Sequence, residues 1–489
     1  MITIILGRAI QFLLALVMMR VATTLLSPEE IGKVSLVLTT TAFFALFLVN
    51  PVGMFINRRL HAWQASGAAR HYLLCYASYL SVVALVAAVG LSALHGSGAV
   101  HFGLSMHWLV VLVCGSLIFN TINQTAIPSL NLLGDSRRFV LLSIATIAAS
   151  FIWATVLVKV GQPVAQHWLL GLLFGQVILG MIGAKVFFAR LKKAEPSSSP
   201  ALSIRKHHLW ALFHFAWPVG IAAGLGWVQG QGYRYLMEWQ LGLAQLGLFV
   251  AGYGISAGMI AGFESVLATY FQPRLYRDAH TDRPELQAQA WQRYAAAMIP
   301  SLLMTAALVV MLAPELTRLF LGEKFQSAAG VIVWGALAEA ARVLAGIYSL
   351  IAHVRMQTRW LLLPNCVGAG LSIALCALLI PVFGSAGGGM ALVLSGGAVV
   401  VTMHALLARQ VGGGVSIRPV LLAGISAGIL WAVTLGSRSV FTSPGWGEIL
   451  GVLSLVGGVY LGFQYLFLQR HLREKEEKGN VSIQPVDIR

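Results

Sequence analysis

The chain has few charged residues, and few of those are acids. Asp, Glu, Lys and Arg make up 10% of its 489 residues, and only 17 are Asp or Glu. Soluble proteins carry roughly 25% charged residues. With 58% hydrophobic residues, no soluble fold could bury the apolar surface. The composition therefore excludes a soluble chain, a disordered chain and a nucleic-acid-binding protein, although the isoelectric point is about 10.0.

Cysteine and sequence motifs of catalysis are also scarce. The four cysteines all fall in apolar segments, which predicts small buried side chains and not disulfides or metal ligands (Cys75, Cys114, Cys366, Cys376). There is no Gly-x4-Gly-Lys-Ser/Thr loop, no His-Glu-x-x-His and no Asp-x-Asp pair, so we expect no cofactor, no metal and no catalytic residues. The longest outward loop, 94–107, offers only histidines as titratable groups. These absences favour a transporter over an enzyme.

Long apolar segments dominate what remains. The mean hydropathy is +0.79, and a membrane-spanning helix needs about 20 mostly apolar residues. We predict an all-α polytopic membrane protein with about 14 transmembrane helices. The first span is too long for a cleavable signal peptide. The predicted spans are 2–26, 34–57, 71–94, 108–131, 139–160, 166–189, 211–237, 245–271, 295–313, 328–352, 360–381, 386–408, 419–436 and 447–468.

The basic residues are distributed unequally between the loops of the two sides. With the N-terminus inside, the inner loops and the tail hold 23 of the 33 Lys and Arg residues, the outer loops 5 and the spans 5. Cytoplasmic loops of membrane proteins carry this excess. We therefore predict that both termini are cytoplasmic, and that the net charge of +16 reflects membrane topology and not a ligand.

Two weak internal matches indicate a six-helix repeat. Arg20 precedes Gly32 by 12 residues, and Arg234 precedes Gly247 by 13 residues. Arg137-Arg138-Phe139 also resembles Thr358-Arg359-Trp360, each before a span. We predict two six-helix bundles related by a pseudo-two-fold axis along the membrane normal, plus two C-terminal helices. The predicted parts are a first bundle at 1–195, a cytoplasmic linker at 196–204, a second bundle at 205–410, two additional helices at 411–469 and a cytoplasmic tail at 470–489.

The seventh span carries the clearest intramembrane polar stripe. Trp227, Gln231, Arg234 and Glu238 share one face at helical spacing. One interpretation is a water-filled cavity lined by this face. The alternative is that Arg234 and Glu238 form a local ion pair near the outer end of the helix.

Other intramembrane charges also require partners or a function. Arg8 and Gln11 share a face of the first span, and Arg20 lies about 120° away. We assign these three, with Arg234, Gln231 and Trp227, to substrate binding in a central cavity, although Arg8 could instead reach the inner interface. Glu264 and Glu339 are candidates for proton coupling, because burial raises a carboxyl pKa. The alternatives are a local pair of Glu339 with Arg342 and an inter-helix pair for Glu264.

Several ordered segments resemble Wzx-type polysaccharide and O-antigen flippases, of the multidrug/oligosaccharidyl-lipid/polysaccharide exporter superfamily. The residues that carry this resemblance are Arg20 with Leu25 to Gly32, Trp217-Pro218, Arg234 to Leu236, Leu246 to Phe249, Gly252-Tyr253, Pro273 to Tyr276 and Leu321 to Phe325. The first span has no acid, unlike the first helix that we associate with cation-coupled drug antiporters.

The resemblance implies translocation of an undecaprenyl-diphosphate-linked oligosaccharide across the bacterial inner membrane, for O-antigen or exopolysaccharide synthesis. Its implied partners are this lipid-linked substrate, membrane lipids and a glycan polymerase, with no nucleic acid. The excess of Arg over acid within the spans agrees, because Arg matches phosphate well. Two alternatives stay open: an ion-coupled drug antiporter of the same superfamily, and a membrane glycan polymerase or ligase.

Overall fold

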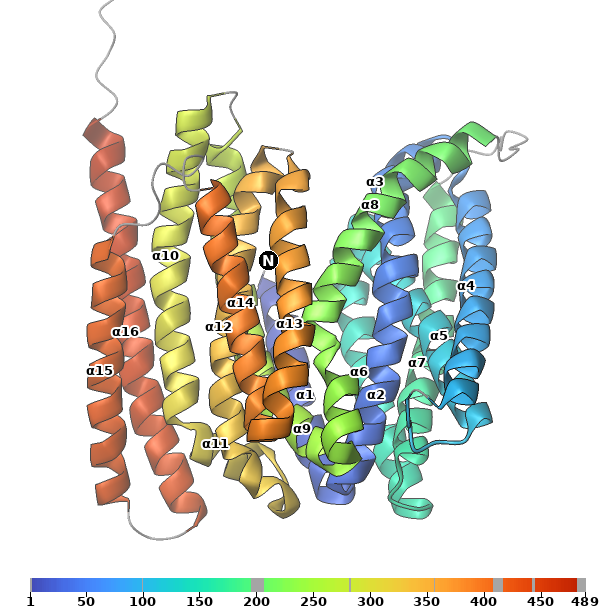
Figure 1. The fold of residues 1–489 in the computed structure, drawn as a ribbon. Helices are drawn as coiled ribbons and strands as arrows, with labels where there is room; N and C mark the ends of the chain where they lie inside the picture. Colours follow the sequence, from blue (N-terminus) through green and yellow to red (C-terminus); the bar gives the residue numbers. More distant parts are fainter. Residues whose placement is uncertain are drawn as a thin grey trace, which may run out of the picture. The chain divides into compact units, whose positions relative to one another are not determined.

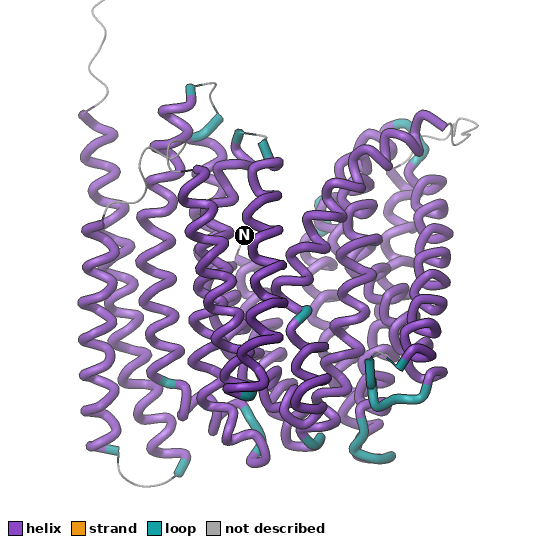
Figure 2. Tube along the Cα trace, in the orientation of Figure 1, coloured by secondary structure: helices purple, strands orange, loops and turns teal. Residues whose placement is uncertain are grey.

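The computed structural model is all-helical (Figure 1). It describes residues 2–98, 100–194, 206–280, 283–355, 357–407, 417–441 and 445–481. Within these ranges the regular elements are helices and no strand occurs (Figure 2). The predicted all-α fold class is confirmed.

The described helices account for the fourteen predicted crossings. Twelve helical segments are long and apolar enough to cross a membrane. One of these, Trp210–Asp278, has 69 residues and a non-helical Gly242 (φ 82°, ψ 170°), so it supplies two crossings. The shorter apolar helix Ile10–Leu25, at the start of the chain, brings the number of crossings to fourteen.

The helices are, in chain order, α1 (Ile2–Leu25), α2 (Pro28–Phe44), the π-helix η1 (Ala45–Val49), α3 (Asn50–Ala65), α4 (Ala69–Ser97), α5 (Met106–Leu132), α6 (Ser136–Val160), α7 (Ala165–Ala194), α8 (Lys206–Gln231), α9 (Tyr233–Asp278), α10 (Pro284–Met311), α11 (Ala313–Phe320), the 3-10 helix η2 (Glu323–Ala328), α12 (Ala329–Val354), the 3-10 helix η3 (Thr358–Leu361), α13 (Leu362–Phe383), α14 (Ser385–Leu407), α15 (Ile417–Val440) and α16 (Trp446–Val481).

The start of α2 shows how the sequence sets a helix boundary. The Ser27 hydroxyl caps the helix by accepting a hydrogen bond from the Glu30 N–H at 3.3 Å, and Pro28 occupies the first helical turn. The Glu30 carboxylate also accepts a hydrogen bond from the N–H of Ala165, the first residue of α7. A carboxylate at a helix N-terminus offsets the helix dipole. One acidic side chain therefore connects the starts of two helices.

The helices α2, η1 and α3 form one span, Pro28–Leu60, which corresponds to the predicted span 34–57. The π-helical turn η1 ends just before Asn50 and Pro51. Proline lacks an N–H and crowds the preceding turn, so it is a common cause of such a local change in helix geometry. The chain stays helical through this irregularity, from α2 through η1 into α3.

Contacts divide the chain into two compact units. Unit 1 comprises Met1–Gly252, Phe320–Ala328 and Asn365–Ser395, and unit 2 comprises Tyr253–Leu319, Ala329–Pro364 and Gly396–Arg489. The two predicted bundles and their pseudo-two-fold relation remain predictions. The predicted linker 196–204 lies outside the described residues, and α16 continues into the predicted tail as far as Val481.

Within unit 1, glycines let helices approach closely. On α7, a Cβ atom added at Gly171 or Gly175 would meet the main chain of Ala154 or Ser150 on α6. The glycines of the predicted repeat motif also meet each other. A Cβ atom at Gly247 would collide with the carbonyl oxygen of Pro28 and lie 2.9 Å from the nitrogen of Gly32.

The reciprocal contact at Gly32 is equally tight, because a Cβ atom there would collide with the carbonyl oxygen of Leu243. The start of α2 and the part of α9 that follows Gly242 therefore cross main chain to main chain. We call residues 28–32 and 243–247 the glycine crossing.

Within unit 2, α10 is the central packing partner. Trp291 of α10 is fully buried and donates a hydrogen bond to the carbonyl oxygen of Ile347 in α12 at 2.9 Å. Both α15 and α16 pack on α10. Arg438 of α15 donates two hydrogen bonds, of 2.8 and 2.9 Å, to the Glu315 carboxylate of α11. The last two predicted helices are thus joined to unit 2 by packing and by a bidentate ion pair.

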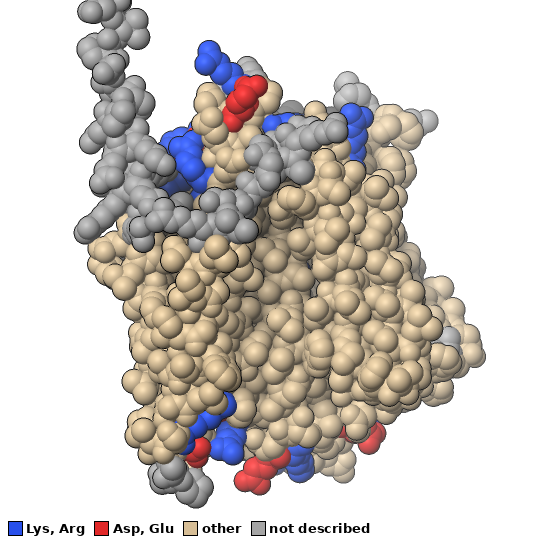
Figure 3. All heavy atoms as spheres, turned by 60° about the vertical axis from the view of Figure 1, so that its left-hand side comes forward, with Lys and Arg blue, Asp and Glu red and all other residues tan. Residues whose placement is uncertain are grey.

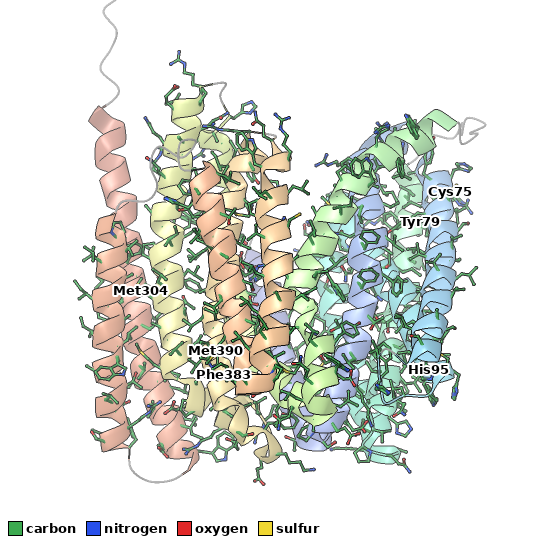
Figure 4. The ribbon with its side chains drawn as sticks, in the orientation of Figure 1. Cys75, Tyr79, His95, Met304, Phe383 and Met390 are labelled. Carbon is green, nitrogen blue, oxygen red and sulfur yellow. The ribbon has the colours of Figure 1, made fainter. Side chains whose placement is uncertain are left out.

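Many exposed charged side chains lie toward the ends of the helices (Figure 3). On the face drawn in Figure 3, Lys, Arg, Asp and Glu gather at the two ends, and the band between them is uncharged. All four cysteines are free, and Figure 4 shows Cys75 and His95 toward opposite ends of α4. Cys376 is buried, but Cys366 is exposed on α13. The prediction of buried cysteines is therefore wrong for Cys366, and Cys75 and Cys114 are half-buried, because a small and weakly polar thiol is tolerated at partly exposed helix positions.

Candidate functional site

A polar cluster in unit 1 joins α2 to the end of α8 and the start of α9. Arg234 Nη1 donates a hydrogen bond to Thr39 Oγ1 at 2.6 Å. Trp227 Nε1 donates to the main-chain carbonyl oxygen of the same threonine at 3.1 Å. The Tyr235 and Thr40 hydroxyls lie 2.6 Å apart. We call Thr39, Thr40, Trp227, Arg234 and Tyr235 the Arg234 cluster.

Small residues on α8 bring the helices of this cluster together. Gly220 and Gly224 pack against Phe47 of η1, with a carbonyl oxygen 2.9 Å from a Cβ atom added at Gly220. The aromatic ring of Trp227 also contacts Phe43, with ring centroids 4.9 Å apart. Two residues of the predicted stripe, Trp227 and Arg234, therefore face α2. The helix is interrupted at Gly232, between Gln231 and Arg234.

Within the part of the chain that the structure describes, no carboxylate neutralises the charge of Arg234. Its side chain is half-buried, its Nε donates to the Tyr233 hydroxyl at 3.3 Å, and its guanidinium lies 5.7 Å from the Tyr233 ring centroid. Among the described residues, no acidic side chain forms an ion pair with Arg234. Glu238 is 8% exposed and contacts the main chain of His101 instead. The alternative ion pair between Arg234 and Glu238 is therefore not formed.

Gln231 lies between Trp227 and Arg234 in the sequence and is half-buried. Its side-chain carbonyl oxygen is buried and has no hydrogen-bond partner in the structure. Leaving a buried acceptor unsatisfied costs about 1–3 kcal/mol. This oxygen is suited to accept a hydrogen bond from a ligand.

The structure describes only part of the environment of the candidate residues on α1. Gln11 and Arg20 are half-buried on α1, and the Arg20 carbonyl oxygen accepts hydrogen bonds from the Thr23 and Thr24 hydroxyls. The side chain of Arg8 lies outside the described residues. The joint action of Arg20 and Arg234 stays a prediction.

A second polar cluster, in unit 2, contains both proton-coupling candidates. Arg342 Nε donates to Glu339 at 2.6 Å, and Arg342 Nη2 donates to Glu264 at 3.0 Å. The Tyr253 hydroxyl donates to the other Glu339 oxygen at 2.6 Å. We call these four residues the carboxylate cluster. The Glu339 side chain is 7% exposed and the Glu264 side chain 30%.

The structure contains the inter-helix pair that was one of the two interpretations of Glu264. The sequence offers it no partner on its own helix, but Arg342 on α12 supplies an ion pair across helices. The same arginine also forms the predicted i, i+3 pair with Glu339. Two carboxylates share one guanidinium, so the cluster has one excess negative charge when both acids are ionised.

Thr39, Thr40 and Tyr253 were not among the predicted site residues. The run Thr39-Thr40-Thr41 within an apolar span was the available signal for the first two, because hydroxyls in membrane helices often bond across helices. In the part of the chain that the structure describes, no group of three or more His, Cys, Asp or Glu side chains could hold a metal ion.

Comparisons with known proteins place the chain in a family. Residues 21–330 match the model of the family described as polysaccharide biosynthesis protein. A comparison with curated protein sequences finds no match. Among solved structures, the lipid II flippase MurJ in an inward closed conformation matches with a TM-score of 0.71 and 12% identity, covering 96% of this chain and 99% of that one.

A multidrug resistance MATE family transporter of the MOP superfamily in an inward-facing conformation matches with a TM-score of 0.64 and 16% identity, covering 82% of this chain and 95% of that one. An outward-facing conformation matches with a TM-score of 0.56 and 14% identity, over 84% and 94%. These proteins are a flippase and transporters, and the chain shares their fold. Because the family model covers more than half of the sequence, the chain belongs to the polysaccharide biosynthesis protein family.

Proposed function

We propose that the protein moves an undecaprenyl-diphosphate-linked oligosaccharide from the inner to the outer leaflet of the bacterial cytoplasmic membrane. The glycan would then enter cell-surface polysaccharide, such as O-antigen or exopolysaccharide. The family and the fold shared with a lipid II flippase support this class of substrate. The unequal distribution of Lys and Arg supports cytoplasmic termini.

The unpaired charge of Arg234 carries the proposal. A partly buried guanidinium without a carboxylate is costly unless an anion or water reaches it. Thr39 and Tyr233 hold this guanidinium with hydroxyl oxygens, which orient it without cancelling its charge. A diphosphate provides the missing anion, and Arg can bind phosphate through two parallel hydrogen bonds.

The neighbouring side chains suit the sugar end of such a substrate. The unsatisfied oxygen of Gln231 can accept a hydrogen bond from a sugar hydroxyl. Trp227 provides an apolar ring face beside it. In this proposal Arg20, Gln11 and Arg8 on α1 add positive charge and polar groups from the opposite wall of the cavity.

The carboxylate cluster supports coupling to a proton gradient. Its excess negative charge is neutralised when one acid binds a proton. Glu264 is the better candidate, because Glu339 already accepts two short hydrogen bonds and is the more buried acid. We propose that proton binding at Glu264 accompanies the transport cycle, with Glu339 holding Arg342 in place.

The test of the diphosphate anchor is export of surface glycan in cells that depend on this chain. Arg234→Ala should abolish export at a normal level of membrane-inserted protein, and Arg234→Lys should be partly active at best. The matched control is Arg137→Ala, at an exposed arginine of α6 outside the Arg234 cluster. Export restored in the Arg234→Ala, Glu238→Ala double variant would contradict the anchor role.

The fold shared with multidrug transporters favours an ion-coupled drug antiporter as the second candidate. The sequence of α1 contains no Asp or Glu, and this absence counts against a cation-coupled antiporter. Drug accumulation measured with and without the protein distinguishes the two functions. Lower drug accumulation together with normal glycan export in an Arg234→Ala strain would favour the antiporter.

A further inference from the structure

We propose that a surface formed by α3 and the first turns of α8 binds the phosphate headgroups of anionic phospholipids in the adjacent leaflet. The surface consists of Arg58 and Arg59 and of the rings Phe55 and Phe215 beneath them. We call it the α3–α8 surface. It lies wholly within unit 1, and Figure 1 shows the two helices side by side. The proposal is independent of the transported substrate.

The two guanidinium groups are held in place by aromatic rings. Arg58 lies 5.0 Å from the centroid of Phe215, and Arg59 lies 5.2 Å from the centroid of Phe55. The two rings are themselves 5.7 Å apart, so they form one platform that joins α3 to α8. A cation over a ring face keeps its N–H groups at the edge available for an anion.

Both guanidinium groups are exposed and lack an acidic partner. Among the described residues, neither Arg58 nor Arg59 forms an ion pair. The sequence reinforces this, because 31–134 and 196–237 contain no Asp or Glu. The exposed pair Arg137 and Arg138 at the start of α6 differs, since Arg138 pairs with Asp135 at 3.4 Å. The α3–α8 surface therefore presents two uncompensated positive charges.

Three exposed aromatic residues on another face of α8 indicate that the surface lies at the boundary between lipid and water. Trp210, Phe213 and Trp217 are spaced by three and four residues on α8 and are 63%, 56% and 49% exposed. Arg58 and Arg59 lie at the end of the span Pro28–Leu60, and Trp210 begins the span Trp210–Asp278. Tryptophan is enriched at membrane interfaces, where its ring sits at headgroup level.

This combination fits a lipid and not a soluble anion. A ligand at this position needs a phosphate for the guanidinium groups and apolar chains that stay in the bilayer, because the two arginines lie at the end of a membrane span. An anionic phospholipid in the leaflet has both. The surface is open and its two arginines rest on separate rings, so neighbouring phospholipids can occupy it at the same time.

The test uses the full-length purified protein in detergent, titrated with phosphatidylglycerol or with zwitterionic phosphatidylcholine while the unfolding temperature is followed. Phosphatidylglycerol should stabilise the unchanged protein more than phosphatidylcholine does. Each Arg near an anionic surface contributes about fivefold in affinity, so Arg58→Gln with Arg59→Gln should weaken phosphatidylglycerol binding by about 25-fold. The response to phosphatidylcholine should not change.

Two further variants separate this site from general charge effects and from misfolding. Arg137→Gln with Arg138→Gln removes the same charge at the start of α6 and should keep the phosphatidylglycerol response. Phe215→Leu keeps both charges but removes the ring beneath Arg58, and it should weaken binding by less than the double arginine variant. If the double variant fails to fold, Phe215→Leu decides the question.

Equal phosphatidylglycerol affinity in the Arg58→Gln, Arg59→Gln variant and in the unchanged protein would overturn the proposal. An equal loss in the Arg137→Gln, Arg138→Gln control would also overturn it. If the double variant binds phosphatidylglycerol normally but loses glycan export equally in vesicles with and without anionic lipid, the surface serves the transported lipid instead. None of these results alters the test of Arg234.

Discussion

Thr39 contacts two predicted substrate-binding residues at once. Its hydroxyl accepts a hydrogen bond from Arg234, and its main-chain carbonyl oxygen accepts one from Trp227. A change of side chain removes only the first contact, because the second belongs to the main chain. The residue therefore allows the orientation of Arg234 to be tested without removing a charge.

We expect Thr39→Val to reduce glycan export by about 10- to 100-fold, because hydrogen bonds to charged groups contribute about 1.5–3 kcal/mol. Valine matches the shape of threonine but cannot accept the hydrogen bond from Arg234. Thr39→Ser, which keeps the hydroxyl, should export near the normal rate. Export rates per membrane-inserted protein provide the measurement, and normal export by Thr39→Val would show that Arg234 needs no such support.

For the carboxylate cluster, we expect Glu264→Gln to flatten the pH dependence of transport in proteoliposomes. Glutamine can still accept a hydrogen bond from Arg342 but cannot bind a proton. The surrounding groups are Arg342, Glu339 and Tyr253, with Tyr294 of α10 facing Glu264.

The control is Glu285→Gln, at an exposed acid in the first turn of α10, which should keep the normal pH profile. An unchanged profile in Glu264→Gln would assign Glu264 a structural role as an inter-helix ion-pair partner.

At the scale of single residues, the sequence predicts which side chains share a helix face, but not which residues of another helix they contact. The spacing of Trp227 and Arg234 predicts a shared helix face, and both side chains bond to Thr39 although the helix is interrupted at Gly232 between them. Thr39 lies 195 residues away from Arg234 in the chain. Likewise, Arg342 is 78 residues from Glu264. Helical periodicity carries no information about which other helix lies opposite, so these contacts required the structure.

At the scale of elements, the glycine crossing sets how closely α2 approaches α9. The two glycines were matched in the sequence as equivalent positions of a repeat, and the structure places them in direct contact. A repeat predicts similar surroundings for equivalent residues. Their mutual contact instead depends on how the two helices cross, which spacing along the chain does not specify.

We expect Gly247→Ala to destabilise the protein by about 1–3 kcal/mol or more, as overpacking does in tightly packed cores. The added methyl group would collide with main-chain atoms, which cannot rotate away. The measurement is thermal unfolding of the purified protein in detergent, together with glycan export.

Gly226→Ala on α8 is the matched control, because nothing lies within 4 Å of its added Cβ atom. It should leave stability unchanged or raise it by up to about 1 kcal/mol, since alanine favours a helix over glycine. Equal stability of Gly247→Ala and Gly226→Ala would show that the crossing is not tightly packed in the membrane.

At the scale of the whole molecule, the sequence predicts the number and the approximate bounds of the membrane crossings. The bilayer fixes the length of an apolar segment, and its lack of water forces the main chain to bond internally as a helix. The grouping of helices into the two contact units was not predicted. Apolar faces packed on lipid and on protein have similar compositions, so hydropathy does not distinguish them.

We also predict that α15 and α16 form the groove beside which the isoprenoid tail of the substrate stays in the lipid. A cavity of about 360 Å³ in unit 2 is lined by α10, α11, α12 and α15, mostly with apolar side chains such as Val310, Met311, Val333, Trp431 and Leu435. Deleting the residues after about 415 should abolish transport. Transport that survives this deletion would contradict the role.

A point variant tests the same role in the full-length chain. Gly330 lines the cavity, and nothing lies within 4 Å of its added Cβ atom. Gly330→Phe should fill the space and slow transport of the natural substrate, while an analogue with a short isoprenoid chain should be transported normally. Equal slowing of both substrates would point to a general structural defect instead.

The glycine crossing also limits which mutations can rescue one another. The atoms that obstruct a side chain at Gly247 or Gly32 belong to the main chains of Pro28, Gly32 and Leu243. No substitution on the opposite helix can remove a carbonyl oxygen, so a local second-site suppressor should not exist. In a genetic selection for restored export, Gly247→Ala should yield true revertants, or distant mutations that shift whole helices. Arg438 and Glu315, whose contact is between side chains, should by contrast readily yield compensating pairs.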